Sequence, residues 1–420
     1  MTSRERISLV LNHKEPDKIP VDLGANRSTG IMASAYDKLK RHLGVNAGVN
    51  HIYDMKQMVA IVEEPILKRF GIDVVPLFRA RYLPYPINPY ADKWKNWQLF
   101  DGTEVEIPAN YIPKEGGKGN LILVNENGDI VGDMPKGGYY FDYPRPGTNP
   151  LEQGEEIKIL IEEYTPSRGF SDGELRCLEE KVDELFKNTD YAILGDSGFL
   201  GLGDGSFRVM SELYSIGYSD WMIMLLTEQE YVREIFDKTV DSWVKNLRLY
   251  KEAIGDKICA IAFADDLGTQ EGEFINPDLF KELIAPYYKK VWDWIHKNTK
   301  WKVFLHSCGS IYSLMPILID CGLDILNPVQ CSAKNMDPVR LKNKFGDRIV
   351  FWGGGCDTQK TLPFGKPEEV RKEVKERIRI FAPGGGFIFN QVHNIQKGTS
   401  PENIMSMFDA VSEFGRYPIQ

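Results

Sequence analysis

The chain alternates between short apolar runs and longer segments with helical periodicity. The apolar runs lie at 19–24, 72–78, 191–196, 258–266, 302–308, 323–330, 348–355 and 386–392, which gives eight candidate strands. They are rich in Val, Ile and Phe and do not alternate cleanly with polar residues. This pattern is typical of parallel strands that are buried on both faces.

Helices are predicted between these runs. Residues 228–252 carry a long 3.6-residue pattern. Asn276-Pro277 and Ser400-Pro401 each place an N-capping residue before a proline at the first helical position, and Lys366-Pro367 opens another helix. Eight strands that alternate with helices predict an α/β fold, a (β/α)₈ TIM barrel, with residues 1–420 as a single domain. An open doubly wound sheet is the alternative, and the strand count favours closure.

One segment interrupts the alternation. Residues 79–170 are rich in Tyr, Pro, Gly and Asn, with turn signals at Asp101-Gly102, Asn127-Gly128 and Gly137-Gly138. We expect short antiparallel strands here, inserted after the second barrel strand. The segment is too aromatic for a linker, so we expect it to lie near the barrel mouth and contribute to a lid.

Composition excludes some classes of partner. The 420 residues have a formal net charge of −9, and Lys and Arg are scattered, so neither nucleic acid nor an anionic membrane is expected as a partner. No run approaches the ~18 apolar residues of a membrane span. The first residues lack the apolar core of a signal peptide. We therefore expect a cytoplasmic protein.

Polar side chains follow six of the predicted strands. In a barrel, the carboxyl ends of the strands hold the active site. These residues are Asp22 and Asn26; Asp196; Asp265, Asp266 and Gln270; His306 and Cys308; Cys356 and Asp357; and Asn390, Gln391 and His393. Because the strand bodies are apolar, we expect these groups to converge on one rim.

His306 and Cys308 are the candidate metal ligands. Their two-residue spacing lets both side chains point the same way if the strand geometry persists. Imidazole and thiolate are good zinc ligands, and a catalytic zinc has three protein ligands and one open position. The third ligand is Cys356 or His393. We prefer Cys356, because thiolate binds zinc well and the glycines at 353–355 allow close approach.

The carboxylates near the rim are candidates for catalysis. Asp265 and Asp266, together with Asp196, are suited to act as a base, to bind a cationic group or to orient a histidine. The alternative for the Asp265-Asp266 pair is a helix or loop cap. The remaining rim residues, Asp22, Asn26, Gln270, Asn390 and Gln391, are the candidate substrate-binding groups. Cys177, Cys259 and Cys321 are expected to be small buried hydrophobic residues.

The chain resembles the uroporphyrinogen decarboxylase superfamily almost end to end. The stretches that carry the resemblance are SRERISLVLNHKEPDKIPVDLG, DDLGTQEG, INPDLF, FLHSCGSI, LDILNPVQ, RIVFWGGG and FIFNQVHNIQKGTSPENI. The resemblance implies a (β/α)₈ barrel. True decarboxylases of this superfamily have an arginine-rich loop after the first strand, whereas PVDLGANRSTG contains only Arg27. In corrinoid-dependent methyltransferases, the other branch, a His-x-Cys pair and a later Cys hold zinc. His306 and Cys308 match the pair, and His393 stands where the later Cys falls.

The resemblance to that branch implies a methyltransferase of a corrinoid-dependent system. It would move a methyl group from a small donor, such as a methoxylated aromatic (O-demethylation), to a corrinoid protein, with zinc as Lewis acid. Aromatic residues of the insert would stack on such a donor. The alternatives are methyl transfer from methylcobalamin to a thiol, a uroporphyrinogen decarboxylase-like enzyme, and a non-enzymatic tetrapyrrole binder.

Overall fold

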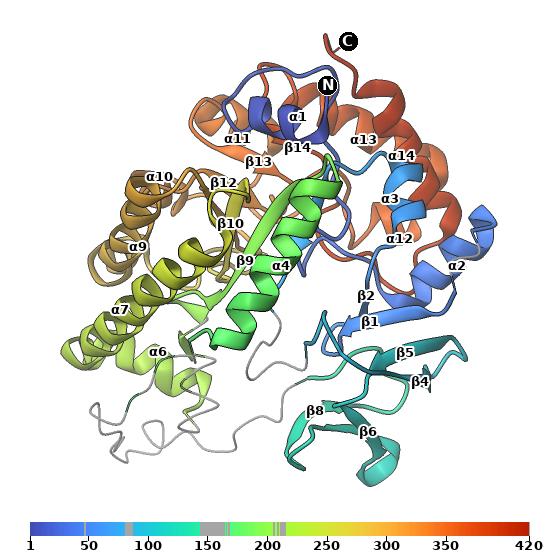
Figure 1. Cartoon of the computed structure of the whole chain (residues 1–420). Coiled ribbons are helices and arrows are strands. Elements are labelled where there is room, and N and C mark those ends of the chain that lie inside the picture. Colours follow the sequence, from blue (N-terminus) through green and yellow to red (C-terminus); the bar gives the residue numbers. More distant parts are fainter. Residues whose placement is uncertain are drawn as a thin grey trace.

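The computed structural model describes residues 1–45, 48–79, 87–142, 164, 166, 169–204, 206–207, 210 and 216–419. Parallel strands form a curled sheet that helices cover on the outside, and the short strands of two smaller sheets lie at the lower right of Figure 1. None of the described helices combines the length and the apolar character needed to cross a bilayer.

The curled sheet contains seven parallel strands in the order β14-β13-β12-β11-β10-β9-β3. Their bounds are β3 (Val74–Leu77), β9 (Ala192–Leu200), β10 (Ala260–Ala264), β11 (Lys302–His306), β12 (Ile325–Asn327), β13 (Val350–Trp352) and β14 (Phe387–Ile388). Val21 closes the circle: it forms a parallel bridge with Phe389 after β14, and its carbonyl accepts the NH of Asp73 before β3. The predicted (β/α)₈ barrel is confirmed, with the 19–24 run reduced to this bridge.

Strand residues alternate between the barrel interior and the helical layer. Ala260 and Ala262 of β10 pack in one cluster with Phe304 and Trp352. Their neighbour Phe263 belongs to the larger outer core and contacts Trp292 of α9, with the ring centroids 6.3 Å apart. Apolar residues therefore serve both faces of the strands, which is why these runs show no polar alternation.

The helices surround this sheet. They are α1 (Ser3–Val10), α2 (Ala33–Leu43), α3 (Glu64–Phe70), α4 (Asp172–Asn188), α6 (Tyr218–Thr227), α7 (Gln229–Ile254), α8 (Pro277–Leu279), α9 (Ala285–Asn298), α10 (Met315–Asp320), α11 (Pro338–Phe345), α12 (Thr361–Phe364), α13 (Pro367–Phe381) and α14 (Pro401–Phe414). The π-helical turn η3 (Phe280–Ile284) joins α8 to α9.

The predicted helix starts are present. The Asn276 side chain accepts the NH groups of Asp278 and Leu279 at the start of α8. The Ser400 side chain accepts the NH of Asn403 at the start of α14. These caps satisfy NH groups that have no partner within the helix.

Two smaller sheets accompany the barrel, the first mixed, with β1 and β5 paired in parallel, and the second antiparallel. β1 (Asn50–Asp54) and β2 (Val59–Ala60) form a four-stranded sheet with β4 (Trp94–Gln98) and β5 (Glu104–Pro108), in the order β2-β1-β5-β4. β6 (Ile112–Glu115), the 3₁₀ turn η1 (Gly117–Gly119), β7 (Leu121–Val124) and β8 (Ile130–Met134) form the second unit. The NH of Phe141 after β8 donates to the carbonyl of Lys56, 2.9 Å away, and so ties this segment to the β1–β2 turn. Most of the 143–170 part of the expected insert lies outside the described residues.

Candidate functional site

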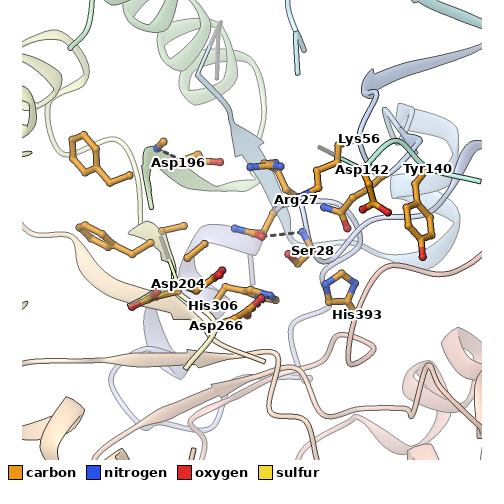
Figure 2. Close-up of a pocket in the computed structure, with 18 of the residues that line it drawn as sticks. Arg27, Ser28, Lys56, Tyr140, Asp142, Asp196, Asp204, Asp266, His306 and His393 are labelled. Atoms are coloured by element: carbon orange, nitrogen blue, oxygen red, sulfur yellow. Dashed lines mark hydrogen bonds and ion pairs between the residues drawn. The ribbon is translucent and has the colours of Figure 1, made fainter. Parts of the chain in front are cut away.

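The loops at the carboxyl ends of the strands surround a cavity of about 490 Å³. Figure 2 shows Asp266 and His306 on one side of it and Lys56, Asp142 and Tyr140 on the other. The charged residues among its described lining are Arg27, Lys56, Asp142, Asp196, Asp204, Asp265 and Asp266. Carboxylates therefore outnumber cations around this pocket.

His306, Cys308 and His393 form a potential metal centre, and His306 and His393 of this group line the pocket. His306 ends β11, Cys308 follows two residues later, and His393 lies in the loop after β14. One ligand atom from each of the three lies within 4.8 Å of the other two. Nε2 of His306 is 3.4 Å from Sγ of Cys308. Two imidazoles and one thiolate are a donor set that fits zinc and leaves a fourth position open.

The His306 ring is held in one orientation by Asn327, the last residue of β12. Nδ2 of Asn327 donates to the carbonyl of Trp352 at 2.8 Å, so Oδ1 is the atom that faces His306. Nδ1 of His306 lies 2.5 Å from that oxygen and must be its donor. Nε2 therefore carries the lone pair and faces Cys308. An outer hydrogen bond of this kind fixes the tautomer of a metal-binding histidine.

Asp266 borders the metal centre. Its Oδ1 accepts the NH of Cys308 at 2.9 Å and lies 3.9 Å from Nε2 of His306. The side chain remains about one-third exposed to the pocket. Burial lowers the pKa of His393 to about 4; His306 adds to the effect and Asp266 opposes it. The His393 imidazole is therefore neutral at neutral pH, the form that binds a metal.

Cys356 does not join this centre, which corrects our preference for it as third ligand. The cluster within the described residues contains His393 instead. Gly353 and Gly354 have φ angles of 123° and 71°, so the chain leaves the strand geometry before Cys356. The buried Cys356 thiol lies 3.9 Å from Oε2 of Glu373 on α13, and burial raises its pKa well above the usual value.

Asp265 holds the loop that follows β9. It is 2% exposed, and its Oδ2 accepts the hydroxyl of Tyr288 at 2.5 Å and the NH of Gly203 at 2.9 Å. The Tyr288 oxygen in turn accepts the NH of Leu202. This carboxylate therefore positions the pocket wall. Asp196, the third predicted catalytic residue, lines the pocket and accepts the NH of Gly198 at 2.8 Å.

The predicted substrate-binding residues divide into two groups. Asn26 lines the pocket, and Gln270 lines a neighbouring groove. Asp22, Asn390 and Gln391 are fully buried. Asn390 donates to the carbonyl of Asp22 and Gln391 to that of Thr29, so they support the 22–30 loop. Their burial argues against direct contact with a substrate.

Asp22 is a buried carboxyl group with an unusual titration. Burial raises its pKa to about 7, against the opposing hydrogen bonds from the NH of Ala25 and the indole of Trp352. In the unfolded chain the group has an ordinary, lower pKa. The folded protein therefore retains the carboxyl proton of Asp22 over a pH range in which the unfolded chain releases it. The stability that the group contributes is complete below pH ~4 and is lost as the pH rises to about 7.

Several residues of the pocket were not predicted as site residues. Arg27 lies at the centre of Figure 2 and pairs with the buried Asp54, with Nε 3.3 Å from Oδ2. Lys56 comes from the β1–β2 turn, and Tyr140 and Asp142 follow β8. Arg27 adjoins the predicted Asn26, whereas Lys56, Tyr140 and Asp142 were missed because they lie outside the barrel strands and the loops that follow them. The Tyr-rich composition of 79–170 was the available signal for Tyr140.

The sequence matches a known protein family. The Uroporphyrinogen decarboxylase (URO-D) family profile matches residues 179–414. The curated uroporphyrinogen decarboxylase of Herminiimonas arsenicoxydans is 36% identical over 74 residues, which are 17% of this chain and 20% of that protein. That of Prochlorococcus marinus is 24% identical over 291 residues, 67% of this chain and 76% of that protein. That of Psychromonas ingrahamii is 24% identical over 195 residues, 45% of this chain and 50% of that protein. The matches to the proteins of Herminiimonas arsenicoxydans and Psychromonas ingrahamii thus span only 20% and 50% of their lengths.

A solved structure extends the comparison over the whole chain. A methyltransferase from Methanosarcina mazei superposes with a TM-score of 0.54, at 17% sequence identity, over 99% of both chains. At this identity the likeness is evidence for the shared fold alone.

Proposed function

The chain belongs to the uroporphyrinogen decarboxylase family, and we propose that within this family it acts as a methyltransferase on a small methyl donor. The donor is an ether such as a methoxylated aromatic, and the acceptor is a reduced corrinoid carried by a partner protein. The observation that carries this proposal is the cluster of His306, Cys308 and His393, of which the two histidines line the pocket. The likeness in fold to a methyltransferase is compatible with it.

The reaction balances as a nucleophilic displacement. The electron pair of cob(I)alamin forms the cobalt–carbon bond, the carbon–oxygen bond of the donor breaks, and the ether oxygen retains the bonding pair and takes up a proton. Cob(I)alamin becomes methylcob(III)alamin, so an external reductant is needed only to generate the cob(I) state. Zinc, when bound, would act as a Lewis acid towards the leaving oxygen.

The residues of this chain position the reactants. Asn327 presents Nε2 of His306 to the metal position, and Asp266 fixes the backbone at Cys308. Tyr140, at the opposite side of the pocket and half-exposed, is placed to contact an aromatic donor ring. Asp266 is also exposed to the pocket, where it can exchange a proton with the departing oxygen.

The charge of the pocket argues against porphyrinogen decarboxylation. Uroporphyrinogen is a macrocycle ringed by carboxylates, which require fixed cations, best supplied by bidentate arginines. The described lining of the pocket contains two cations, Arg27 and Lys56, against five carboxylates. Arg27 already pairs with Asp54. The net negative lining suits a neutral or cationic donor.

A donor screen tests the proposal. The zinc-loaded protein is mixed with cob(I)alamin and a series of methoxylated aromatics, and methylcobalamin and the free phenol are measured together. We expect both products in equal amounts, and no decarboxylated product from uroporphyrinogen. Decarboxylation of uroporphyrinogen by this protein alone would refute the proposal. Methylation of a thiol by methylcobalamin, with every ether inert, would establish the reverse direction of transfer instead.

A further inference from the structure

A second cavity of about 420 Å³ adjoins the pocket and shares His393 and Gln396 with it. The loops that follow β10 to β14 form it. Cys308 also lines this groove, so the predicted metal centre stands between the two cavities. In Figure 2 His393 lies at the lower edge of the pocket, on the side away from Asp196.

The groove differs from the pocket in its chemistry. Its described lining contains no Asp, Glu, Lys or Arg. Amide and hydroxyl side chains predominate: Thr269, Gln270, Gln330, Thr358, Gln359, Asn394 and Gln396. A surface of this kind offers many hydrogen-bond donors and acceptors and no net charge. It therefore suits a ligand that is polar, extended and neutral.

The amides of the groove are pre-oriented and partly available. Nε2 of Gln270 donates to Oε1 of Gln359 at 3.2 Å, and Oε1 of Gln330 accepts the NH of Gly309 at 2.8 Å. These contacts leave Oε1 of Gln270 as an acceptor and Nε2 of Gln359 as a donor, neither bonded within the described part of the chain. Both side chains are exposed. Such a pair can bind a carboxamide of a ligand through both its NH₂ and its C=O groups.

We propose that this amide groove binds the edge of the corrinoid ring. The proposal deepens the methyltransferase function proposed above and rests on it. Corrinoids carry neutral acetamide and propionamide arms around the ring, whereas uroporphyrinogen carries carboxylates that would need cations in the groove. The uncharged lining of the groove thus suits a corrinoid and does not suit uroporphyrinogen.

The position of the groove suits the transfer. In a displacement, cobalt must approach the methyl carbon from the side opposite to the leaving oxygen. His393 and Gln396 line both cavities, so a ring with one edge in the groove would reach past these two residues towards the pocket in which the donor is expected to bind.

The binding of two free corrinoids tests, without any catalytic step, whether the uncharged groove prefers amide arms to carboxylates. Cobinamide retains the ring amides, and cobyrinic acid carries carboxylates in their place. We expect titration of the zinc-loaded full chain, followed by corrinoid absorbance, to show cobinamide binding at least about tenfold more tightly. Gln359→Lys should reduce or invert this preference by favouring the carboxylates. Gln98→Lys, on an exposed strand of the β4–β5 hairpin, is the matched control and should change neither affinity.

Kinetics separate this proposal from the function on which it rests. In methyl transfer, Gln359→Lys and Gln270→Glu should raise the KM for cob(I)alamin about fivefold or more and leave the KM for the ether unchanged. Methyl transfer with an unchanged corrinoid KM in both variants would overturn the groove assignment and leave the function intact. Amide-selective binding without transfer from any donor would support the groove and overturn the function. Equal binding of the two corrinoids, or binding of neither, would overturn the groove assignment.

Discussion

Replacing Asn327 with alanine should weaken zinc binding although it removes no ligand. Asn327 is fully buried at the end of β12, and its amide connects Nδ1 of His306 to the carbonyl of Trp352. Without it, the His306 ring loses both the partner that fixes its tautomer and the contact that fixes its rotation. Nε2 then faces Cys308 in only a fraction of the molecules.

The size of the effect follows from these two hydrogen bonds. Loss of an outer hydrogen bond to a metal-binding histidine lowers affinity by roughly 10- to 100-fold, which corresponds to about 1.4–2.7 kcal/mol. The variant also leaves the Trp352 carbonyl and the His306 ring NH without their partner, which costs about 1–3 kcal/mol of folding stability for each buried group. Both losses should therefore be measurable.

Competition with a chelator gives the zinc dissociation constant, and urea unfolding of the zinc-free protein gives the stability. Asn403→Ala is the matched control, because this buried amide donates to the carbonyls of Leu362 and Gly365, and neither lines the pocket. The control should lose stability and keep its zinc affinity. Asn327→Asp retains the acceptor for His306 and should bind zinc better than the alanine variant. An alanine variant with wild-type zinc affinity would show that the orientation argument is wrong.

Three further outcomes are expected. Cys308→Ser should lower the bound zinc from about one per chain, whereas Cys356→Ala should leave it unchanged by elemental analysis; the opposite pattern contradicts the assigned ligand set. Tyr288→Phe should cost about 1–3 kcal/mol in urea unfolding, since both partners of its hydroxyl are buried. Tyr250→Phe should cost less, because that buried hydroxyl has no partner among the described residues. Asp22→Asn should gain stability relative to the wild type as the pH rises from 4 to 7, by up to about 1.4 kcal/mol per pH unit. If the difference in unfolding free energy between the two proteins is the same at all pH values, the raised pKa of Asp22 is contradicted.

The barrel could be predicted from sequence because each strand is buried on both faces. Parallel pairing and burial both select uninterrupted apolar runs, and each of the eight apolar runs corresponds to a barrel strand or to the bridge at Val21. The sheet of β1, β2, β4 and β5 was not predicted as such. β1 has a mixed polar and apolar sequence and pairs with β5, a partner distant in sequence, so no local pattern reveals it.

The part of the site that lies at a strand end could be predicted from the sequence. His306 ends β11, so its direction and that of Cys308 follow from the strand. Cys356 follows glycines with positive φ angles, which redirect the chain in a way that residue alternation does not reveal. Lys56 and Tyr140 reach the pocket from segments outside the barrel, and only the folded chain brings them there.

The proposed methyl transfer can be followed directly with a labelled methyl group, from the donor to cobalt. A methoxylated aromatic with a ¹³C-methyl group, found active in the donor screen, is incubated with cob(I)alamin and either the wild-type protein or His393→Ala. We expect the wild type to place the label on cobalt, detected by NMR, with one phenol released for each methyl transferred. The variant should bind less zinc and transfer the methyl group at least about a hundredfold more slowly. Transfer at the wild-type rate by zinc-free His393→Ala would contradict the claim that this metal centre performs the reaction.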